Sequence, residues 1–198
     1  LIKKQPTNIF AHNNLAVSLM KMKKLDEAIL SFEKALSLDP NFNQASINLA
    51  EIYVLKNDTN KAEFYLKELV KNNSKTMQIL MISAEIFIKI RKIDSAIKIY
   101  EMVKKLNPNS FDLSINLGRA YDIKGDYENA TDNFLKAVKY NPNSVLAHYN
   151  LASTYMHSHN YKASITHFEK SIKLNPRYYQ SYANLGLVYK RMLELDKA

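Results

Sequence analysis

Three histidines lie close together in the last third of the chain, and imidazole nitrogen is both a common zinc ligand and a common general base. They are His157, His159 and His167. The first two are two positions apart, so they do not share a helix face, and no carboxylate completes a credible set of metal ligands. We therefore expect structural or solvent-exposed roles for these histidines, and we predict no metal site and no cofactor.

A second candidate for chemistry is Ser31-Phe32-Glu33-Lys34, which matches the S-x-x-K pattern of some acylating enzymes. It falls on a predicted helix at a core position, and the partner motifs of those enzymes do not accompany it. The chain has no cysteine, which excludes a cysteine nucleophile and leaves the compartment open between the cytosol, which we favour, and the periplasm. Three glycines are too few to build a phosphate-binding loop. We predict no catalytic residue and a chain that is not an enzyme.

The elements that would position any site are clearest in residues 107–142. Small and apolar residues recur at helical spacing on both sides of Gly125-Asp126, which predicts two amphipathic helices separated by a turn. Prolines bracket this pair at an interval of 34 residues, and the interval recurs along the chain: Pro6, Pro40, Pro108, Pro142 and Pro176, with Ser74 in the one vacant position. The chain is therefore predicted to be an array of helix pairs.

The period divides the chain into five complete units and two incomplete ones. The complete units are residues 9–42, 43–76, 77–110, 111–144 and 145–178, while residues 1–8 align with the end of a preceding unit and residues 179–198 with the start of a sixth. Terminal units of a stacked array normally present a polar outer face, and neither end does so here. We therefore expect a single solenoid over residues 1–198 that is a segment of a longer protein.

Small residues at fixed positions predict close helix contacts. In the first helices they are Ala16, Ala50, Ala84, Gly118, Ala152 and Gly186, and in the second helices Ala28, Ala62, Ala96, Ala130, Ser164 and Ala198. Bulky residues occupy the matching sites of the second helices: Phe32, Leu66, Tyr100, Phe134 and Phe168. Aspartates are expected at or near the starts of the second helices, where a carboxylate helps to satisfy free N–H groups and the helix dipole, and asparagines are expected to cap the first helices. The aspartates are Asp26, Asp58, Asp94, Asp126 and Asp196, and the asparagines are Asn41, Asn109 and Asn143.

This alternation of small and large residues, together with the terminal proline of each unit, resembles the tetratricopeptide repeat. The resemblance covers essentially the whole chain and is weakest in residues 77–110, where Ser83 replaces the usual leucine. It implies an all-α fold, a right-handed α-solenoid of antiparallel helix pairs. It also implies that the first helices line a concave groove, which in this family commonly holds an extended peptide or a partner's helix.

The resemblance further implies which residues face that groove. The sixth position of the first helices carries an asparagine in five units and isoleucine in one: Asn14, Asn48, Ile82, Asn116, Asn150 and Asn184. An amide offers a donor and an acceptor, so it can pair with a peptide backbone whatever the side-chain sequence. A similar asparagine ladder lines the groove of O-linked N-acetylglucosamine transferase. We expect the five asparagines to bind peptide; the alternative is an amide bonded to its neighbours or to water.

Two further surfaces are candidates for contact with a partner. An apolar patch in the groove, formed by Ile47, Met81, Ile82 and Ile115, would anchor a hydrophobic side chain unless these residues only pack between first helices. A basic edge at Lys89, Arg91 and Lys92 would meet phosphate or an acidic peptide unless it is only a solvated edge.

The overall charge has the same sign as that edge. The chain has 28 Lys and Arg against 19 Asp and Glu, a net charge of +9. Aromatic residues are not interleaved with the basic ones, which argues against binding of single-stranded nucleic acid. The Lys, Asn and Arg cluster with which some tetratricopeptide domains grip a terminal carboxylate is not evident.

Two classes of function are compatible with these features. The one we favour is a scaffold that binds a protein or peptide partner in its groove. The alternative is the substrate-recruiting arm of an enzyme such as a glycosyltransferase, or a scaffold that self-associates through its repeat ends. The longest apolar stretch, residues 79–90, is interrupted by polar residues and is too short for a transmembrane segment.

Overall fold

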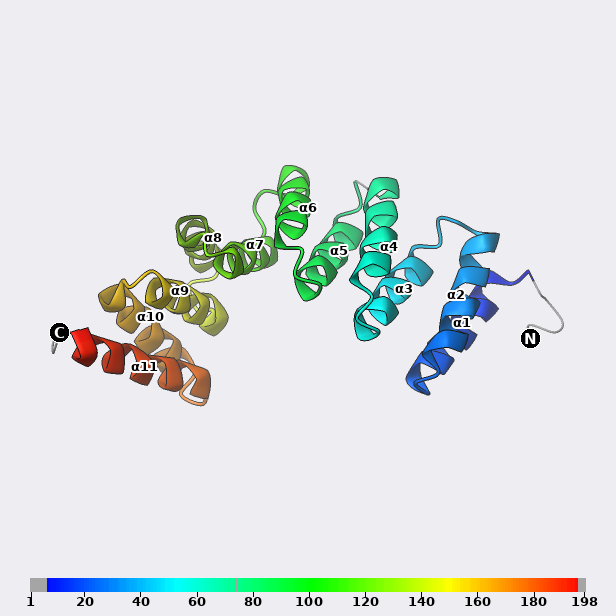
Figure 1. Cartoon of the computed structure of the whole chain (residues 1–198). Coiled ribbons are helices and arrows are strands. Elements are labelled where there is room, and N and C mark those ends of the chain that lie inside the picture. Colours follow the sequence, from blue (N-terminus) through cyan, green and yellow to red (C-terminus); the bar gives the residue numbers. More distant parts are fainter. Residues whose placement is uncertain (1–6, 74, 196–198) are drawn as a thin grey trace. The chain divides into compact units, whose positions relative to one another are not determined.

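The computed structural model describes residues 7–73 and 75–195, and every regular element in these ranges is an α-helix (Figure 1). The helices are α1 (Ile9–Lys21), α2 (Leu25–Leu38), α3 (Asn43–Leu55), α4 (Thr59–Asn72), α5 (Met77–Lys89), α6 (Ile93–Leu106), α7 (Phe111–Lys124), α8 (Tyr127–Tyr140), α9 (Val145–His157), α10 (Tyr161–Leu174) and α11 (Tyr179–Leu195). The predicted all-α fold is confirmed. Pro6, Ser74, Asp196 and Ala198 lie outside the described residues.

First and second helices alternate with the period of the sequence. The first helices begin at residues 9, 43, 77, 111, 145 and 179, and the second helices at residues 25, 59, 93, 127 and 161. Each element therefore recurs after 34 residues with no insertion. The short connections place the two helices of a pair side by side and antiparallel.

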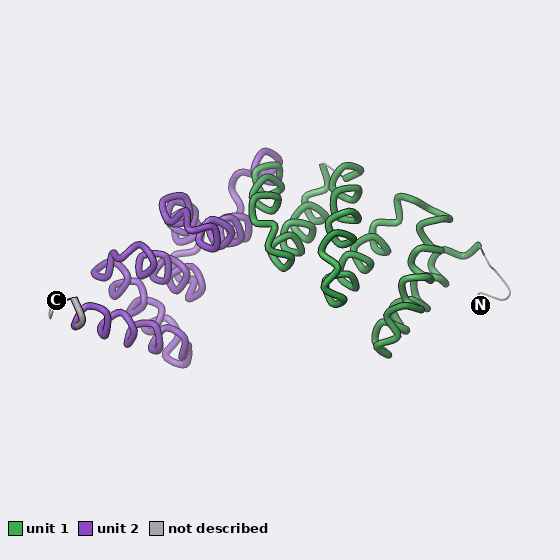
Figure 2. Tube along the Cα trace, viewed as in Figure 1, with its two compact units in different colours: residues 1–102 green, residues 103–198 purple. Residues whose placement is uncertain are grey.

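The chain separates into two compact units, residues 1–102 (unit 1) and residues 103–198 (unit 2), shown in different colours in Figure 2. Consecutive helices from α1 through α5 pack against one another, and α3 also contacts α1 and α5. In unit 2 the same holds from α7 to α11, with α9 contacting both α7 and α11. Neighbouring first helices therefore form one surface of each unit, which we call the first-helix face. That all the repeats form one continuous solenoid stays a prediction.

Within the described part of the chain, no helix combines the length and the apolar character needed to cross a bilayer.

The interior of unit 2 pairs small residues with large ones. A core cluster of α7, α8 and α9 contains Ile115, Phe134 and Leu151, and Phe134 is only 1% exposed. The ring of Phe134 lies over Gly118, since a Cβ atom placed on this glycine would be 2.7 Å from the nearest ring carbon. The close helix contact that the small residue predicts is therefore present at this position.

One residue in every turn between a first and a second helix has a left-handed backbone. These residues are Lys23, Asn57, Arg91, Gly125 and His159, with φ angles of 60°, 57°, 59°, 83° and 61°. In each turn the next N–H donates to a carbonyl five residues earlier, as in Asp126 N to Tyr121 O at 3.0 Å, which is the closing bond of a Schellman motif. The repeat therefore imposes the conformation, and only Gly125 adopts it without steric cost.

This periodicity predicts that Lys23→Gly stabilises unit 1. Left-handed backbone costs a residue with a Cβ atom roughly 1–2 kcal/mol. Glycine removes this cost, but part of the resulting gain in stability is offset by the greater freedom of glycine in the unfolded chain. We expect a net gain of about 1 kcal/mol in the free energy of unfolding, measured by urea titration. Asn57→Gly is the matched control and should gain less, because asparagine tolerates this conformation. Loss of stability in the Lys23 variant would show that its backbone is not strained.

The caps agree with the sequence at the second helices more than at the first. Asp58 and Asp126 cap α4 and α8, accepting from backbone N–H groups at 3.1 and 3.2 Å. Asp26 lies in the first turn of α2, near its start as predicted, and accepts a hydrogen bond from Lys56. The predicted first-helix caps were wrong. The observed N-cap residues are Asn8, Phe42, Thr76, Ser110 and Ser144. Asn41 and Asn143 instead lie inside linker turns that are closed by hydrogen bonds from Phe42 N to Asp39 O and from Ser144 N to Asn141 O.

Candidate functional site

A hollow of about 390 Å³ opens on the first-helix face of unit 2. Residues of α7, α9 and α11 line it, together with Phe134 of α8. They are Arg119, Asp122, Ile123, Phe134, Tyr149, Asn150, Ser153, Met156, His157 and Asn184. Two asparagines of the predicted ladder, Asn150 and Asn184, are therefore brought to one hollow.

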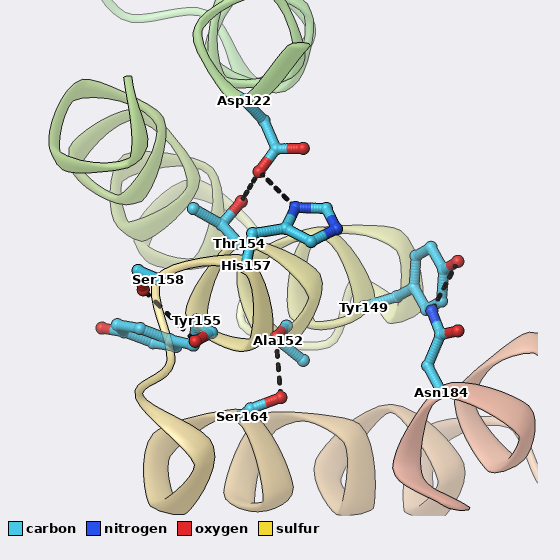
Figure 3. Close-up of polar contacts among 9 residues, drawn as sticks. All are labelled: Asp122, Tyr149, Ala152, Thr154, Tyr155, His157, Ser158, Ser164 and Asn184. Atoms are coloured by element: carbon cyan, nitrogen blue, oxygen red, sulfur yellow. Dashed lines mark hydrogen bonds and ion pairs between the residues drawn. The ribbon is translucent and has the colours of Figure 1, made fainter. Parts of the chain in front are cut away.

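A carboxylate joins α7 to α9 at one side of the hollow (Figure 3). Asp122 Oδ1 accepts a hydrogen bond from the hydroxyl of Thr154 at 2.8 Å and lies 3.1 Å from His157 Nδ1. Thr154 is buried, so its hydroxyl depends on this acceptor. The negative charge of Asp122 is thus already engaged by two side chains of α9.

A second contact joins α9 to α11 at the opposite side (Figure 3). Asn184 Nδ2 donates to the hydroxyl of Tyr149 at 3.1 Å. The ring of Tyr149 packs edge-to-face on Tyr178 with 5.2 Å between ring centroids, and it is also tilted against Phe168. Packed aromatic rings of this kind hold the hydroxyl in place, so the amide of Asn184 has a fixed position on the wall.

Between these contacts lie two buried polar atoms with no internal partner. Neither Asn150 Nδ2 nor Ser153 Oγ forms a hydrogen bond with any described residue. A buried polar group left unpaired costs roughly 1–3 kcal/mol, and such groups are rare in native proteins. A half-turn about the terminal torsion of Asn150 exchanges its nitrogen and oxygen, so the amide can donate or accept. The two side chains are therefore suited to bonding a group that enters the hollow.

A positively charged side chain also lines this hollow. Arg119 of α7 is exposed, and it forms no ion pair with a carboxylate in the described ranges. Ile123, one turn later on α7, is also exposed. The hollow thus combines one available positive charge, polar groups on α9 and apolar walls.

The other ladder asparagines are less uniform than the sequence suggests. Asn14 is exposed and accepts a long 3.5 Å bond from Asn13. Asn48 is only 7% exposed and accepts from Gln44 at 3.2 Å. Asn116 is half-buried and already engaged within the protein. Groove contact by these three stays a prediction, while Asn150 and Asn184 lie on a hollow.

The predicted apolar patch is corrected at two of its four positions. Ile47 is 9% exposed and Ile115 is 5% exposed, so both side chains serve the interior. Ile115 belongs to the Phe134 cluster, because its position on α7 faces α8 rather than solvent. Met81 and Ile82 are half-buried on α5.

The predicted basic edge is partly neutralised. Lys92 Nζ lies 3.1 Å from Glu63 Oε2, and Lys67 pairs with the same carboxylate at 2.8 Å. Hydrogen bonds from Lys67 and Lys92 lower the pKa of Glu63. Arg91 occupies a left-handed turn position, and Lys89 borders a separate hollow of about 270 Å³ in unit 1. That hollow is lined by Met20, Glu51, Val54, Leu55 and Lys89.

A pair of histidines, the buried His148 and the half-buried His167, joins α9 to α10, and the sequence analysis does not identify His148. His148 Nδ1 lies 3.0 Å from His167 Nδ1, and His148 Nε2 lies 3.0 Å from Pro142 O. A carbonyl can only accept, so His148 donates from Nε2 and accepts at Nδ1 from His167. Nothing in the sequence marks His148, because its partner is 19 residues away. Among the described residues, no three His, Cys, Asp or Glu side chains form a group suited to a metal ion.

This pair predicts that unit 2 loses stability in mild acid. Burial lowers the pKa of both histidines, and the charge of Lys170 lowers that of His148 further, against the opposing effect of the bond to Pro142. The unfolded chain therefore takes up protons at a pH where the folded pair does not. The contribution of the pair is fully present above about pH 6.5 and is lost as the pH falls below this value.

The measurement is the urea midpoint at about pH 7.5 and about pH 5.5. The control variant is His148→Ser with His167→Asn, because the preceding repeat carries Ser114 and Asn133 at the same positions. The parent should lose more stability in acid than the variant. Equal losses would show that the pair does not titrate on unfolding.

A family model described as the cytochrome c-type biogenesis protein H TPR domain matches residues 2–112, and tetratricopeptide repeat models match residues 118–158, 145–178 and 167–198. The chain belongs to the tetratricopeptide repeat family. Human tetratricopeptide repeat protein 21A is 27% identical over 143 residues, which cover 64% of this chain but only 11% of that protein.

Solved structures share the fold at low sequence identity. A tetratricopeptide repeat protein from Parabacteroides merdae is 20% identical with a TM-score of 0.79, covering 93% of this chain and 73% of that one. YrrB, described as a TPR protein with an unusual peptide-binding site, is 19% identical with a TM-score of 0.70 over 92% of this chain and 94% of that one. MamA is 20% identical with a TM-score of 0.70, covering 87% and 94%. At these identities the likeness is one of fold.

Proposed function

We propose that the chain is a non-enzymatic interaction scaffold and that the first-helix face of unit 2 binds an extended peptide. The observation that carries this proposal is the pair Asn150 and Ser153, two residues that line the hollow and that each bury a polar atom with no internal partner. A peptide backbone supplies both an N–H and a C=O at every residue, so it can satisfy both groups.

The dimensions of the face suit an extended chain. Packed helices lie roughly 8–10 Å apart, and an extended peptide advances about 3.3 Å per residue. Each first helix would therefore meet about three peptide residues, and the hollow spans α7, α9 and α11. YrrB, a TPR protein with an unusual peptide-binding site, supports the same use of this fold.

The test is selection of peptides from a random library of N-acetylated, C-amidated decapeptides, followed by titration of the selected peptides. Asn150→Ala with Ser153→Ala should weaken binding about 10- to 100-fold, since each neutral hydrogen bond contributes about 0.5–1.5 kcal/mol. The matched control removes the same chemical groups outside the hollow, with Asn143→Ala and Ser158→Ala. Equal binding by the two double variants would remove the hollow as the site.

Self-association is tested separately from peptide binding. Light scattering that rises with protein concentration, without peptide, would show a scaffold that assembles with itself. The recruiting arm of an enzyme would bind peptide in the same way, and the complete sequence of the encoding gene separates it from a free-standing scaffold.

A further inference from the structure

We propose that the hollow of unit 2 selects peptides that carry a side-chain carboxylate, held by Arg119 together with Ser153 and Asn150. This rests on the proposed function, because it names the chemistry of the peptide that the same face binds. It concerns a side chain within the peptide and not a terminal carboxylate.

The available groups at the hollow are mainly donors. The Arg119 guanidinium has five N–H groups in a fork that fits a carboxylate, and it has no carboxylate partner within the described ranges. The Ser153 hydroxyl is unpaired, and the Asn150 amide has an unpaired N–H₂ group. The Arg119 side chain is exposed, and the two unpaired donors of Ser153 and Asn150 are buried in side chains that line the same hollow; together they complement a carboxylate, which is an acceptor with several lone pairs.

The one carboxylate at the hollow does not oppose this. Asp122 already accepts from Thr154 at 2.8 Å and faces His157 at 3.1 Å. These contacts turn its Oδ1 toward α9, and they leave Arg119 as the charge that an incoming group meets. Asp122 lies three residues after Arg119 on the same helix, and its Oδ1 is already engaged by α9, so Arg119 is left to pair with the carboxylate of a ligand.

The apolar part of the hollow accommodates the stem of such a side chain. Ile123 is 54% exposed, and Phe134 and Met156 also contribute to the lining. A glutamate has two methylene groups before its carboxylate, which can lie on this apolar surface while the carboxylate reaches Arg119. The net charge of +9 draws acidic peptides to the chain as a whole, but the hollow specifies where the carboxylate binds.

The experiment uses four fluorescent pools of N-acetylated, C-amidated decapeptides. They are random except for one central residue, which is Glu, Gln, phosphoserine or Lys, and fluorescence anisotropy measures their binding. We expect the Glu pool to bind about 10-fold more tightly than the Gln pool. Arg119→Gln should remove this difference, whereas Arg177→Gln, which removes an exposed charge outside the hollow, should keep it. The preference should also weaken as salt is raised.

Each outcome decides a different question. If the Glu and Gln pools bind equally while the Asn150 and Ser153 double variant still weakens both, the carboxylate inference is wrong and the peptide site stands. Tighter binding of the phosphoserine pool than the Glu pool would assign the hollow to phosphate, and preference for the Lys pool would overturn the charge argument. If no pool binds, or if the double variant leaves binding unchanged, the proposed function itself is wrong.

Discussion

Gly118→Leu is expected to destabilise unit 2 by up to about 3 kcal/mol, the upper range for overpacking a core. Even a Cβ atom at this position would lie 2.7, 2.9 and 3.0 Å from three carbons of the Phe134 ring. Those ring atoms are buried with Ile115, Ala130 and Leu151, so the ring has little room to move. A urea or thermal unfolding curve of the variant measures the loss.

Gly186 provides the matched control, because it occupies the same position of a first helix and has no atom within 4 Å of a Cβ added to it. Gly186→Leu should be neutral or stabilising, since leucine has a higher helix propensity than glycine. Equal effects of leucine at the two positions would show that helix propensity, and not the contact with Phe134, governs Gly118.

Phe134→Ala is expected to cost about 3–5 kcal/mol, the usual range for truncating a buried aromatic residue. Its ring is 1% exposed and fills the space between α7, α8 and α9. Unfolding of the variant, followed by circular dichroism, gives the loss directly. A cost below about 1 kcal/mol would mean that the cluster collapses around the missing ring.

The two substitutions should also compensate each other. Leucine at position 118 occupies part of the cavity that Phe134→Ala leaves, so the double variant should be more stable than the sum of the single effects predicts. Additive effects would show that the two residues are not in contact. The cycle therefore tests the small–large pairing that recurs along the chain.

The helices could be predicted well from the sequence because the same pattern of small and large residues recurs in every repeat. A first helix begins at residue 9 and then after every 34 residues, and Gly118 meets Phe134 as the alternation of small and large side chains indicates. Caps were harder to predict, because an asparagine after a proline also suits a linker turn. Ser110 and Ser144 cap the helices instead, one residue after Asn109 and Asn143.

Only part of the candidate site could be predicted from the sequence. Position within the repeat predicted Asn150 and Asn184, but it could not show that Asn184 donates to Tyr149 while Asn150 keeps an unpaired nitrogen. Arg119 and Asp122 carry no periodic signal, since the equivalent positions of other repeats hold different residues. Their roles arise from contacts between helices, and only the folded arrangement defines these contacts.

Under the proposed function, Asn150 and Ser153 each keep a buried polar atom unpaired because a bound peptide uses it. The most direct test is the unfolding midpoint of the parent and of the Asn150→Ala, Ser153→Ala variant, each measured with and without a peptide selected by the parent. Without peptide, the variant should be as stable as the parent or more so, because it no longer buries two unpaired polar groups. With peptide at about 100 times its Kd, the parent should gain about 2.7 kcal/mol and the variant much less. A variant that is clearly less stable without peptide, or that gains as much from the peptide as the parent does, would contradict the claim.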